Sequence, residues 1–160
     1  MKISVILYNL RSLYNVGSIF RTADAAGVEK IYLAGFTPAP LDVFKKPRPR
    51  MLKVSLGAEK SVPWKKISQS STVKLLKDLK TKGYKILAIE QNKKSLPYYK
   101  IHKIKDFKKI ALVMGNEIKG LPSSVLVQAD KILEIPMLGR KESLNVSIAF
   151  AIVVYRLLFN

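Results

Sequence analysis

Short apolar runs alternate with amphipathic stretches along the 160 residues of the chain. An apolar run rich in β-branched residues predicts a strand that is covered on both faces of its sheet. Such runs occupy residues 3–8, 30–34, 85–90, 110–114 and 131–135. Apolar residues spaced three or four positions apart predict helices, here over residues 15–26, 72–83, 122–128 and 144–160. The alternation predicts a single α/β domain with a mostly parallel sheet and helices on both faces.

The segment between residues 35 and 63 interrupts this alternation. It is rich in proline and carries the basic sequence KKPRPR at residues 45–50. Proline removes a backbone N–H group and restricts the residue before it. We therefore expect this sequence to form an extended, exposed loop rather than a helix.

Two polar residues stand where predicted helices begin. Asn15 and Ser143 precede apolar periodic runs, and residues of these types accept hydrogen bonds from the first turn of a helix. We expect Asn15 to cap the first helix, which Gly27 ends, and Ser143 to cap the last. Thirteen of the 16 residues at 144–159 are apolar, so this last helix must be buried on nearly all sides. It is either a central core helix or one that also forms a dimer interface, and the two are compatible.

The charge of the chain is concentrated in its middle. The net charge is +18, and residues 44–109 hold 20 of the 29 basic residues but only four of the 11 acidic ones. Such a segment favours a nucleic-acid partner, because basic side chains neutralise phosphates and release counterions. The candidate RNA contacts are Lys45, Lys46, Arg48 and Arg50. The alternative is a solvated lysine-rich surface that serves solubility.

Several classes of protein are disfavoured. The chain has no cysteine and one histidine, so we expect neither disulfides nor a metal site. It has no signal peptide and no apolar run long enough to span a bilayer, which predicts a cytoplasmic protein without membrane contact. It has neither a dinucleotide-binding nor a nucleotide-triphosphate glycine motif. His102 lies in a lysine-rich run, and we assign it no catalytic role.

Three segments place polar residues where predicted strands end and helices begin, which is where open α/β sheets bind ligands. The first contains Asn15, Gly17 and Arg21, and the missing side chain at Gly17 would let Arg21 lie back toward a helix start that favours anions. The second is MGNEIKGLP at residues 114–122, in which a glycine would allow close approach of a ligand. The third is IPMLGRKESLNVS at residues 135–147. Each segment has a plainer reading as helix caps and solvated loops.

Taken together, the three segments resemble the sequence motifs of the SpoU/TrmH family of RNA 2′-O-ribose methyltransferases, within the SPOUT superfamily. NxGxxxRTA matches Asn15 to Ala23, GNExxGL matches Gly115 to Leu121, and IPM…SLNVS matches Ile135 to Ser147. The match spans almost the whole chain. It implies an α/β catalytic domain over residues 1–160 with a C-terminal deep trefoil knot, and no separate RNA-binding extension is expected.

The resemblance also implies a cofactor, partners and site residues. The expected reaction is methylation of a ribose 2′-hydroxyl in RNA by S-adenosylmethionine, in a homodimer that completes its site with an arginine. The implied catalytic residues are Arg21, Asn15, Glu117, Ser143 and Asn145. The implied cofactor-binding residues are Gly115, Asn116, Ile135, Pro136, Met137, Ser143, Leu144 and Asn145, together with Glu90 and Gln91.

The role expected for Arg21 is electrostatic. A guanidinium holds its proton too strongly to act as a base, so Arg21 would stabilise the developing alkoxide and bind phosphate. Transfer RNA is favoured over ribosomal RNA by the size of the chain. The alternatives are a non-catalytic RNA-binding or ribosome-associated protein, and a SPOUT methyltransferase that acts on ribosomal RNA or on a base.

Overall fold

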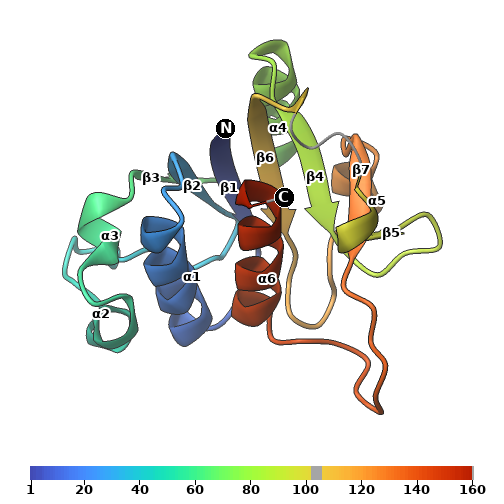
Figure 1. Cartoon of the computed structure of the whole chain (residues 1–160). Helices are drawn as coiled ribbons and strands as arrows, with labels where there is room; N and C mark the ends of the chain where they lie inside the picture. The colour runs from blue at the N-terminus through green and yellow to red at the C-terminus, as the bar shows by residue number, and fades with distance from the viewer. Residues whose placement is uncertain (102–105, 160) are drawn as a thin grey trace.

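A seven-stranded sheet, parallel throughout, forms the middle layer of the protein (Figure 1). The computed structural model describes residues 1–101 and 106–159, so His102 lies outside the described residues. The strand order is β3-β2-β1-β6-β4-β7-β5. The strands are β1 (Lys2–Tyr8), β2 (Lys30–Ala34), β3 (Trp64–Ile67), β4 (Lys85–Ile89), β5 (Leu96–Pro97), β6 (Lys109–Met114) and β7 (Lys131–Glu134). The predicted fold class, a parallel-sheet α/β domain, is confirmed.

Helices cover both faces of the sheet (Figure 1). They are α1 (Leu13–Ala25), α2 (Pro49–Ser55), α3 (Ala58–Ser61), α4 (Thr72–Thr81), α5 (Ser123–Leu126) and α6 (Val146–Leu158), with a short 3-10 turn at Tyr98–Lys100. One apolar core joins the sheet to α1 and α6 and includes Phe20 and Phe150. The other joins it to α4 and α5 and includes Leu76 and Val125. Within the described residues, no helix is both long and apolar enough to cross a membrane.

The five predicted strands are present, and the two strands at the edges of the sheet were not predicted. The residues of β6 after Lys109 are buried, as an apolar run between two helical layers must be. The sequence of β3, WKKI, instead has two exposed lysines between half-buried end residues, and β5 contains two residues. Such short or polar edge strands leave no apolar run in the sequence.

The expectation of a loop without helix at residues 45–50 is wrong. Helix α2 begins at Pro49. The N–H group of the first helical residue has no partner within the helix, so proline, which lacks this group, fits that position. Before it, the Asp42 carboxylate accepts hydrogen bonds from the N–H groups of Phe44 and Lys46, both at 2.8 Å. The basic residues therefore lie on a tight turn and the start of a helix.

Both predicted caps are wrong by two or three residues. Ser12 caps α1 by accepting from the N–H of Asn15 at 3.2 Å. Asn145 caps α6 by accepting from the N–H of Ser147 at 2.9 Å. Ser and Asn are equally suited to capping, so the sequence pattern could not choose between neighbouring candidates. The shift releases the Asn15 amide and the Ser143 hydroxyl from capping.

Helix α6 is buried on one side and apolar on the other. Its inward residues include Phe150, Val153 and Leu157. Ile148 and Tyr155 are 52% and 42% exposed, and Phe159, which stacks on Tyr155, extends the same stripe beyond the C-terminal end of the helix. We expected α6 to be buried on nearly all sides. Within a single chain, only its inward side is buried.

A buried threonine ties β1 to the loop after β2. The Thr37 hydroxyl donates to the carbonyl of Leu7 at 2.8 Å and accepts from the N–H of Leu10 at 2.9 Å. All three residues are fully buried. The Leu10 N–H has no access to water, so it depends on this hydroxyl.

We predict that Thr37→Val lowers the free energy of unfolding by about 2 kcal/mol, because it leaves a buried N–H and a buried C=O without this partner. Urea unfolding followed by circular dichroism measures the change. Thr81→Val is the matched control, because the Thr81 hydroxyl bonds the Asp78 carbonyl in an exposed position. Equal effects of the two substitutions would contradict the prediction.

Candidate functional site

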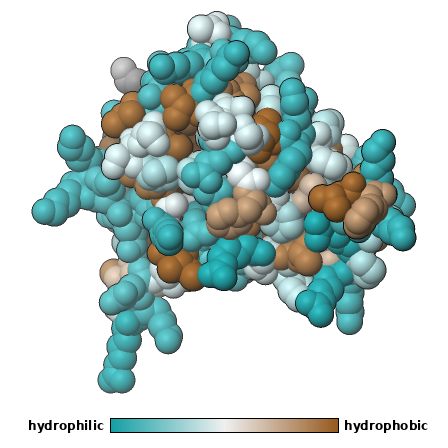
Figure 2. Space-filling model, turned by 180° about the vertical axis from the view of Figure 1, so that it is seen from behind, coloured by the Kyte–Doolittle hydropathy of each residue, from teal (hydrophilic) through white to brown (hydrophobic). Residues whose placement is uncertain are grey.

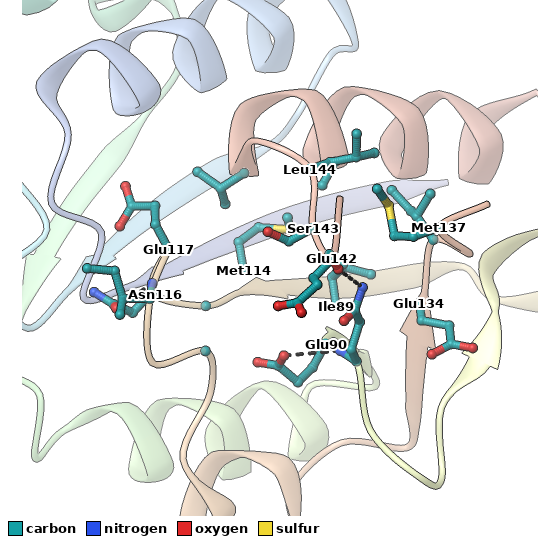
Figure 3. A pocket seen from close by; sticks show the side chains of 17 residues that line it. Ile89, Glu90, Met114, Asn116, Glu117, Glu134, Met137, Glu142, Ser143 and Leu144 are labelled. Carbon is teal, nitrogen blue, oxygen red and sulfur yellow. Dashed lines mark hydrogen bonds between the residues drawn. The ribbon is translucent and has the colours of Figure 1, made fainter. Parts of the chain in front are cut away.

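A cavity of about 300 Å³ lies where β4, β6 and β7 end, under the segment that leads into α6 (Figure 3). The parallel arrangement brings these strand ends to one edge of the sheet. Its lining combines apolar residues, among them Ile89, Met114 and Val146, with polar ones. The second and third sequence segments both contribute to its walls.

Most residues that the sequence predicted for cofactor binding line this cavity. They are Glu90, Gln91, Gly115, Asn116, Ile135, Met137, Ser143 and Leu144. Pro136 and Asn145 belong to the same segment but are not among the lining residues. The sequence analysis missed Glu134 and Glu142, which flank the predicted segment. Acidic residues beside a strand end in so basic a chain were the signal that could have indicated them.

The cavity is acidic in a strongly basic protein. Four of the 11 acidic residues of the chain line it, namely Glu90, Glu117, Glu134 and Glu142. None of the described lining residues is lysine or arginine. Carboxylates gathered in a partly enclosed space favour a cationic ligand. The arrangement disfavours a phosphate group as the occupant.

A tight turn over residues 116–120 forms one wall of the cavity. The Asn116 side chain accepts from the N–H groups of Ile118 and Lys119 at 3.0 and 2.8 Å and donates to the carbonyl of Asn9 at 2.6 Å. Gly120 has a positive φ of 62°. The same amide therefore closes the turn and joins it to the end of β1.

Gly115 lines the cavity, as expected, and the packing of its own loop also requires glycine there. A Cβ atom there would lie 2.8 Å from the carbonyl carbon of Gly120 and 2.9 Å from the Leu121 side chain. Its own loop, rather than a ligand, occupies the space that a side chain would need. Gly115 thus permits the turn to fold back on β6.

Glu90 and Gln91 hold the walls of the cavity together. Glu90 accepts a hydrogen bond from the N–H of Leu121 at 2.7 Å, and a Cβ on Gly120 would lie 2.2 Å from this carboxylate. The Gln91 side chain donates to the carbonyl of Glu142 at 2.6 Å (Figure 3). The segments after β4, β6 and β7 are thereby joined at one point.

A chain of three polar side chains links the three sequence segments. The Glu117 carboxylate accepts from the Asn15 amide at 3.1 Å and from the backbone N–H of Arg11 at 3.1 Å. The Asn15 carbonyl oxygen accepts from the Asn145 amide at 3.0 Å. This Glu117–Asn15–Asn145 network fixes the orientation of each amide, since each donor meets a defined acceptor. It positions the start of α1 against the start of α6.

Ser143 and Arg21 stand apart from this network. Ser143 is exposed and lines the cavity. Arg21 is exposed on α1 and is not among the residues that line the cavity. The space at Gly17 is not free for the Arg21 stem, because a Cβ there would lie 2.9 Å from the Met51 carbonyl oxygen and 3.3 Å from Val54. Gly17 therefore permits close packing of α1 on α2.

The predicted RNA-contact residues do not form a uniform group. Lys45, Lys46 and Arg50 are exposed, whereas Arg48 is half-buried at the start of α2. Burial lowers the pKa of Lys66, and the nearby positive charge of Arg48 lowers it further.

Within the described residues, two ion pairs form, Lys2–Glu29 and Lys80–Asp130. Hydrophilic side chains cover most of the face shown in Figure 2.

Known proteins resemble this chain over nearly its full length. A Bacillus subtilis protein, 23S rRNA (guanosine(2553)-2'-O)-methyltransferase RlmP, is 33% identical over 89% of this chain. The tRNA (guanosine(18)-2'-O)-methyltransferase of Aquifex aeolicus is 30% identical over 92% of this chain. The crystal structure of an AdoMet-bound rRNA methyltransferase from Sinorhizobium meliloti aligns with a TM-score of 0.85 and 29% identity over 98% of this chain.

The chain spans only part of these relatives. It covers 52% of the Bacillus protein, 64% of the Aquifex protein and 55% of the Sinorhizobium chain. The profile of the SpoU rRNA Methylase family matches residues 2–155. With its parallel sheet and with two of its motif segments lining one cavity, the chain belongs to the SpoU rRNA Methylase family.

Proposed function

We propose that this chain methylates a ribose 2′-hydroxyl in RNA with S-adenosylmethionine as methyl donor. The observation that carries the proposal is the acidic cavity at the edge of a basic protein. S-adenosylmethionine has a positively charged sulfur and a positively charged amino group, which carboxylates attract. A polyanionic RNA instead requires the basic surface outside the cavity.

The residues around the cavity fit this cofactor. Glu90, Glu134 and Glu142 offer acceptors for hydroxyl and amino groups, and Ile89, Met114, Leu144 and Val146 offer apolar surface for the adenine ring and methylene groups. Gly115, Asn116, Gln91, Ser143 and the Ile135–Pro136–Met137 segment complete the proposed binding set. When bound, the cofactor supplies a methyl group activated by its positive sulfur. The protein's contribution is then mainly to position the ribose.

The Glu117–Asn15–Asn145 network supplies that positioning. Glu117 already accepts hydrogen bonds from two backbone N–H groups and one amide, so its carboxylate serves as an anchor for these segments. We place the ribose beside Ser143, which lines the cavity, and Asn145, which donates to Asn15. The 2′-oxygen would form a bond to the methyl carbon as the bond from that carbon to sulfur breaks, which leaves the sulfur as a neutral thioether. The hydroxyl proton would pass to a neighbouring group or to water, and Arg21 would stabilise the developing negative charge.

The proposal includes a homodimer. Arg21 does not line the cavity of its own chain, and α6 with the residue after it presents an apolar stripe formed by Ile148, Tyr155 and Phe159. A second copy packed on this stripe would bury it and bring its own Arg21 to the site. Burial of these three large apolar side chains on each chain suits an interface.

We also propose that the segment between β7 and α6 passes through a loop of the chain to form a deep trefoil knot, as the family resemblance implies. The contact between Gln91 and the Glu142 carbonyl, at 2.6 Å, places that segment against the one after β4. Residues 1–160 would constitute the catalytic domain. The compartment proposed for the reaction is the cytoplasm, where transfer and ribosomal RNA are made or used.

Methyl transfer from labelled S-adenosylmethionine to unmodified RNA tests the proposed function. Transfer RNA is the first substrate to assay and ribosomal RNA the second, since relatives act on each. Nucleoside analysis should recover a 2′-O-methyl nucleoside. A methylated base would instead favour the base-modifying alternative, and RNA binding without transfer would favour the non-catalytic one.

We predict that Glu117→Gln lowers kcat by about two orders of magnitude, because a glutamine amide has one acceptor oxygen and cannot accept from the Arg11 N–H, the Ser12 N–H and the Asn15 amide together. The KM for the cofactor should change much less. Asp78→Asn is the control, since it removes one negative charge from an exposed position on α4. An unchanged kcat in Glu117→Gln would contradict the positioning role.

Mixing two inactive variants tests whether Arg21 acts across a dimer. Arg21→Ala and Glu117→Ala should each be inactive, and a mixture should regain activity up to about a quarter of the wild-type level, because the mixed dimer contains one intact site. Ile148→Glu should yield monomers in sedimentation and abolish the recovery. A mixture that stays inactive while dimers exchange would place Arg21 at the site of its own chain.

Neutralising the exposed basic turn should weaken RNA binding. We predict that replacing Lys45, Lys46 and Arg50 by alanine reduces the slope of log K against log salt by about 2 to 3, as loss of three phosphate contacts requires. Filter binding at several salt concentrations measures the slope. Alanine at Lys74, Lys77 and Lys85, three exposed lysines of α4 and β4, is the control of equal charge. Equal losses would indicate non-specific attraction.

A further inference from the structure

A second cavity, of about 480 Å³, lies on the other side of the turn at residues 116–120. Asn116, Ile118 and Gly120 line both cavities, so this turn is a shared wall. Asn116 and Glu117 appear on it in Figure 3. The other walls of the second cavity come from the ends of β1, β2 and β3. A ligand that reaches around the turn would contact both cavities.

The two cavities have opposite charge. Arg11 and Lys119 line the second one, and no Asp or Glu is among its described lining residues. The first cavity has four carboxylates and no cation in its lining. The second cavity therefore suits part of an anionic molecule, whereas the first suits a cation.

The amide groups in the second cavity can adopt only one orientation. The N–H of Phe36 donates to Oδ1 of Asn9 at 3.2 Å, and a backbone N–H can only donate. Nδ2 of Asn9 must then donate, and it does so to Oε1 of Gln69 at 3.1 Å. Gln69 is thus fixed with its oxygen toward Asn9. Its NH₂ group, which takes part in no hydrogen bond among the described residues, is left for a ligand.

The backbone is strained where it holds this arrangement. Asn9 has a positive φ of 54°, which few residues other than glycine adopt. Gly35 also has a positive φ, and a Cβ there would lie 1.7 Å from Oδ1 of Asn9. Strain of this kind persists where the surrounding structure enforces it and is frequent at ligand sites. The Asn9 amide is consequently a fixed part of the cavity.

An exposed aromatic ring completes the lining. Phe36 is 58% exposed although its neighbours Gly35 and Thr37 are anchored by hydrogen bonds. Every nucleobase has a π-face that can stack on an aromatic side chain. The cavity thus offers a stacking surface, a hydrogen-bond donor and two cations within one space.

We infer that this second cavity binds the base of the nucleotide whose ribose is methylated, an inference that rests on the proposed function. The base stacks on Phe36, and Arg11 and Lys119 meet the adjoining phosphates. The ribose then lies at the shared wall, beside the Glu117–Asn15–Asn145 network and the first cavity. The NH₂ group of Gln69 selects a base with a carbonyl oxygen, which guanine, uracil and cytosine have and adenine lacks.

Substitution of Phe36 tests the stacking contact. Phe36→Leu keeps an apolar side chain and should raise the KM for RNA and the Kd for a fluorescein-labelled transfer RNA transcript by one to two orders of magnitude. Phe36→Trp should retain wild-type values, because it keeps an aromatic face. The Kd for S-adenosylmethionine should stay unchanged in both. Equal RNA affinity of Phe36→Leu and wild type would overturn the inference.

Gln69→Glu tests the donor. Its carboxylate still accepts from Asn9 but presents an acceptor to the base in place of a donor. We expect kcat/KM for RNA to fall roughly 10- to 100-fold, which is the effect of losing one hydrogen bond to the base. Ser70→Glu places the same charge one residue away at an exposed position. It should lower kcat/KM for RNA only a few-fold. Similar losses in the two variants would show a purely electrostatic effect and overturn the selectivity.

The binding assay separates this inference from the proposed function. If wild type binds RNA but transfers no methyl group, the proposed function fails, and the dependence of Kd on Phe36 and Gln69 still decides whether the cavity holds a base. If wild type methylates RNA and neither substitution matters, the proposed function stands and this inference falls. If wild type neither binds nor methylates RNA, both fall.

Discussion

The parallel direction of all strands is the constraint on which the rest of the structure depends. It requires every strand to end at the same edge of the sheet, so the segments after β1, β4, β6 and β7 meet there. Hydrogen bonds then fix how they meet. Asn116 binds the end of β1, Glu90 binds the turn after β6, and Gln91 binds the segment after β7. Distant parts of the sequence thereby form two adjacent cavities whose walls cannot move independently.

The sequence predicted what depends on burial and missed what depends on local geometry. Apolar runs identified the five covered strands, and motif residues identified most of the first cavity. The polar edge strand β3 has no such run. The prolines at residues 45–50 predicted a loop, whereas Pro49 is the first residue of helix α2. The second cavity depends on the positive φ of Asn9 and on the orientation of two amides. Neither property can be read from residue types alone.

Opposite charges lie a short distance apart in the two cavities. The net charge of +18 would attract a polyanion to much of the surface. The four carboxylates of the first cavity create a local exception, and the shared turn at residues 116–120 divides it from the cations of the second. Arg11 marks this boundary, because its backbone N–H donates to Glu117 while the residue lines the basic cavity. A cation and an anion can therefore bind side by side without exchanging places.

The apolar stripe on α6 and the position of Arg21 pose one structural problem. A single chain leaves Ile148 and Tyr155 about half exposed, which costs the burial that apolar side chains favour. It also leaves the arginine of the first motif outside the acidic cavity. If a second copy covers the stripe, the same contact buries the apolar residues and delivers a guanidinium to each site. The folding stability of the chain and its methyl-transfer activity would then depend on the same interface. A monomer would therefore be both less stable and inactive, rather than stable with a slower reaction.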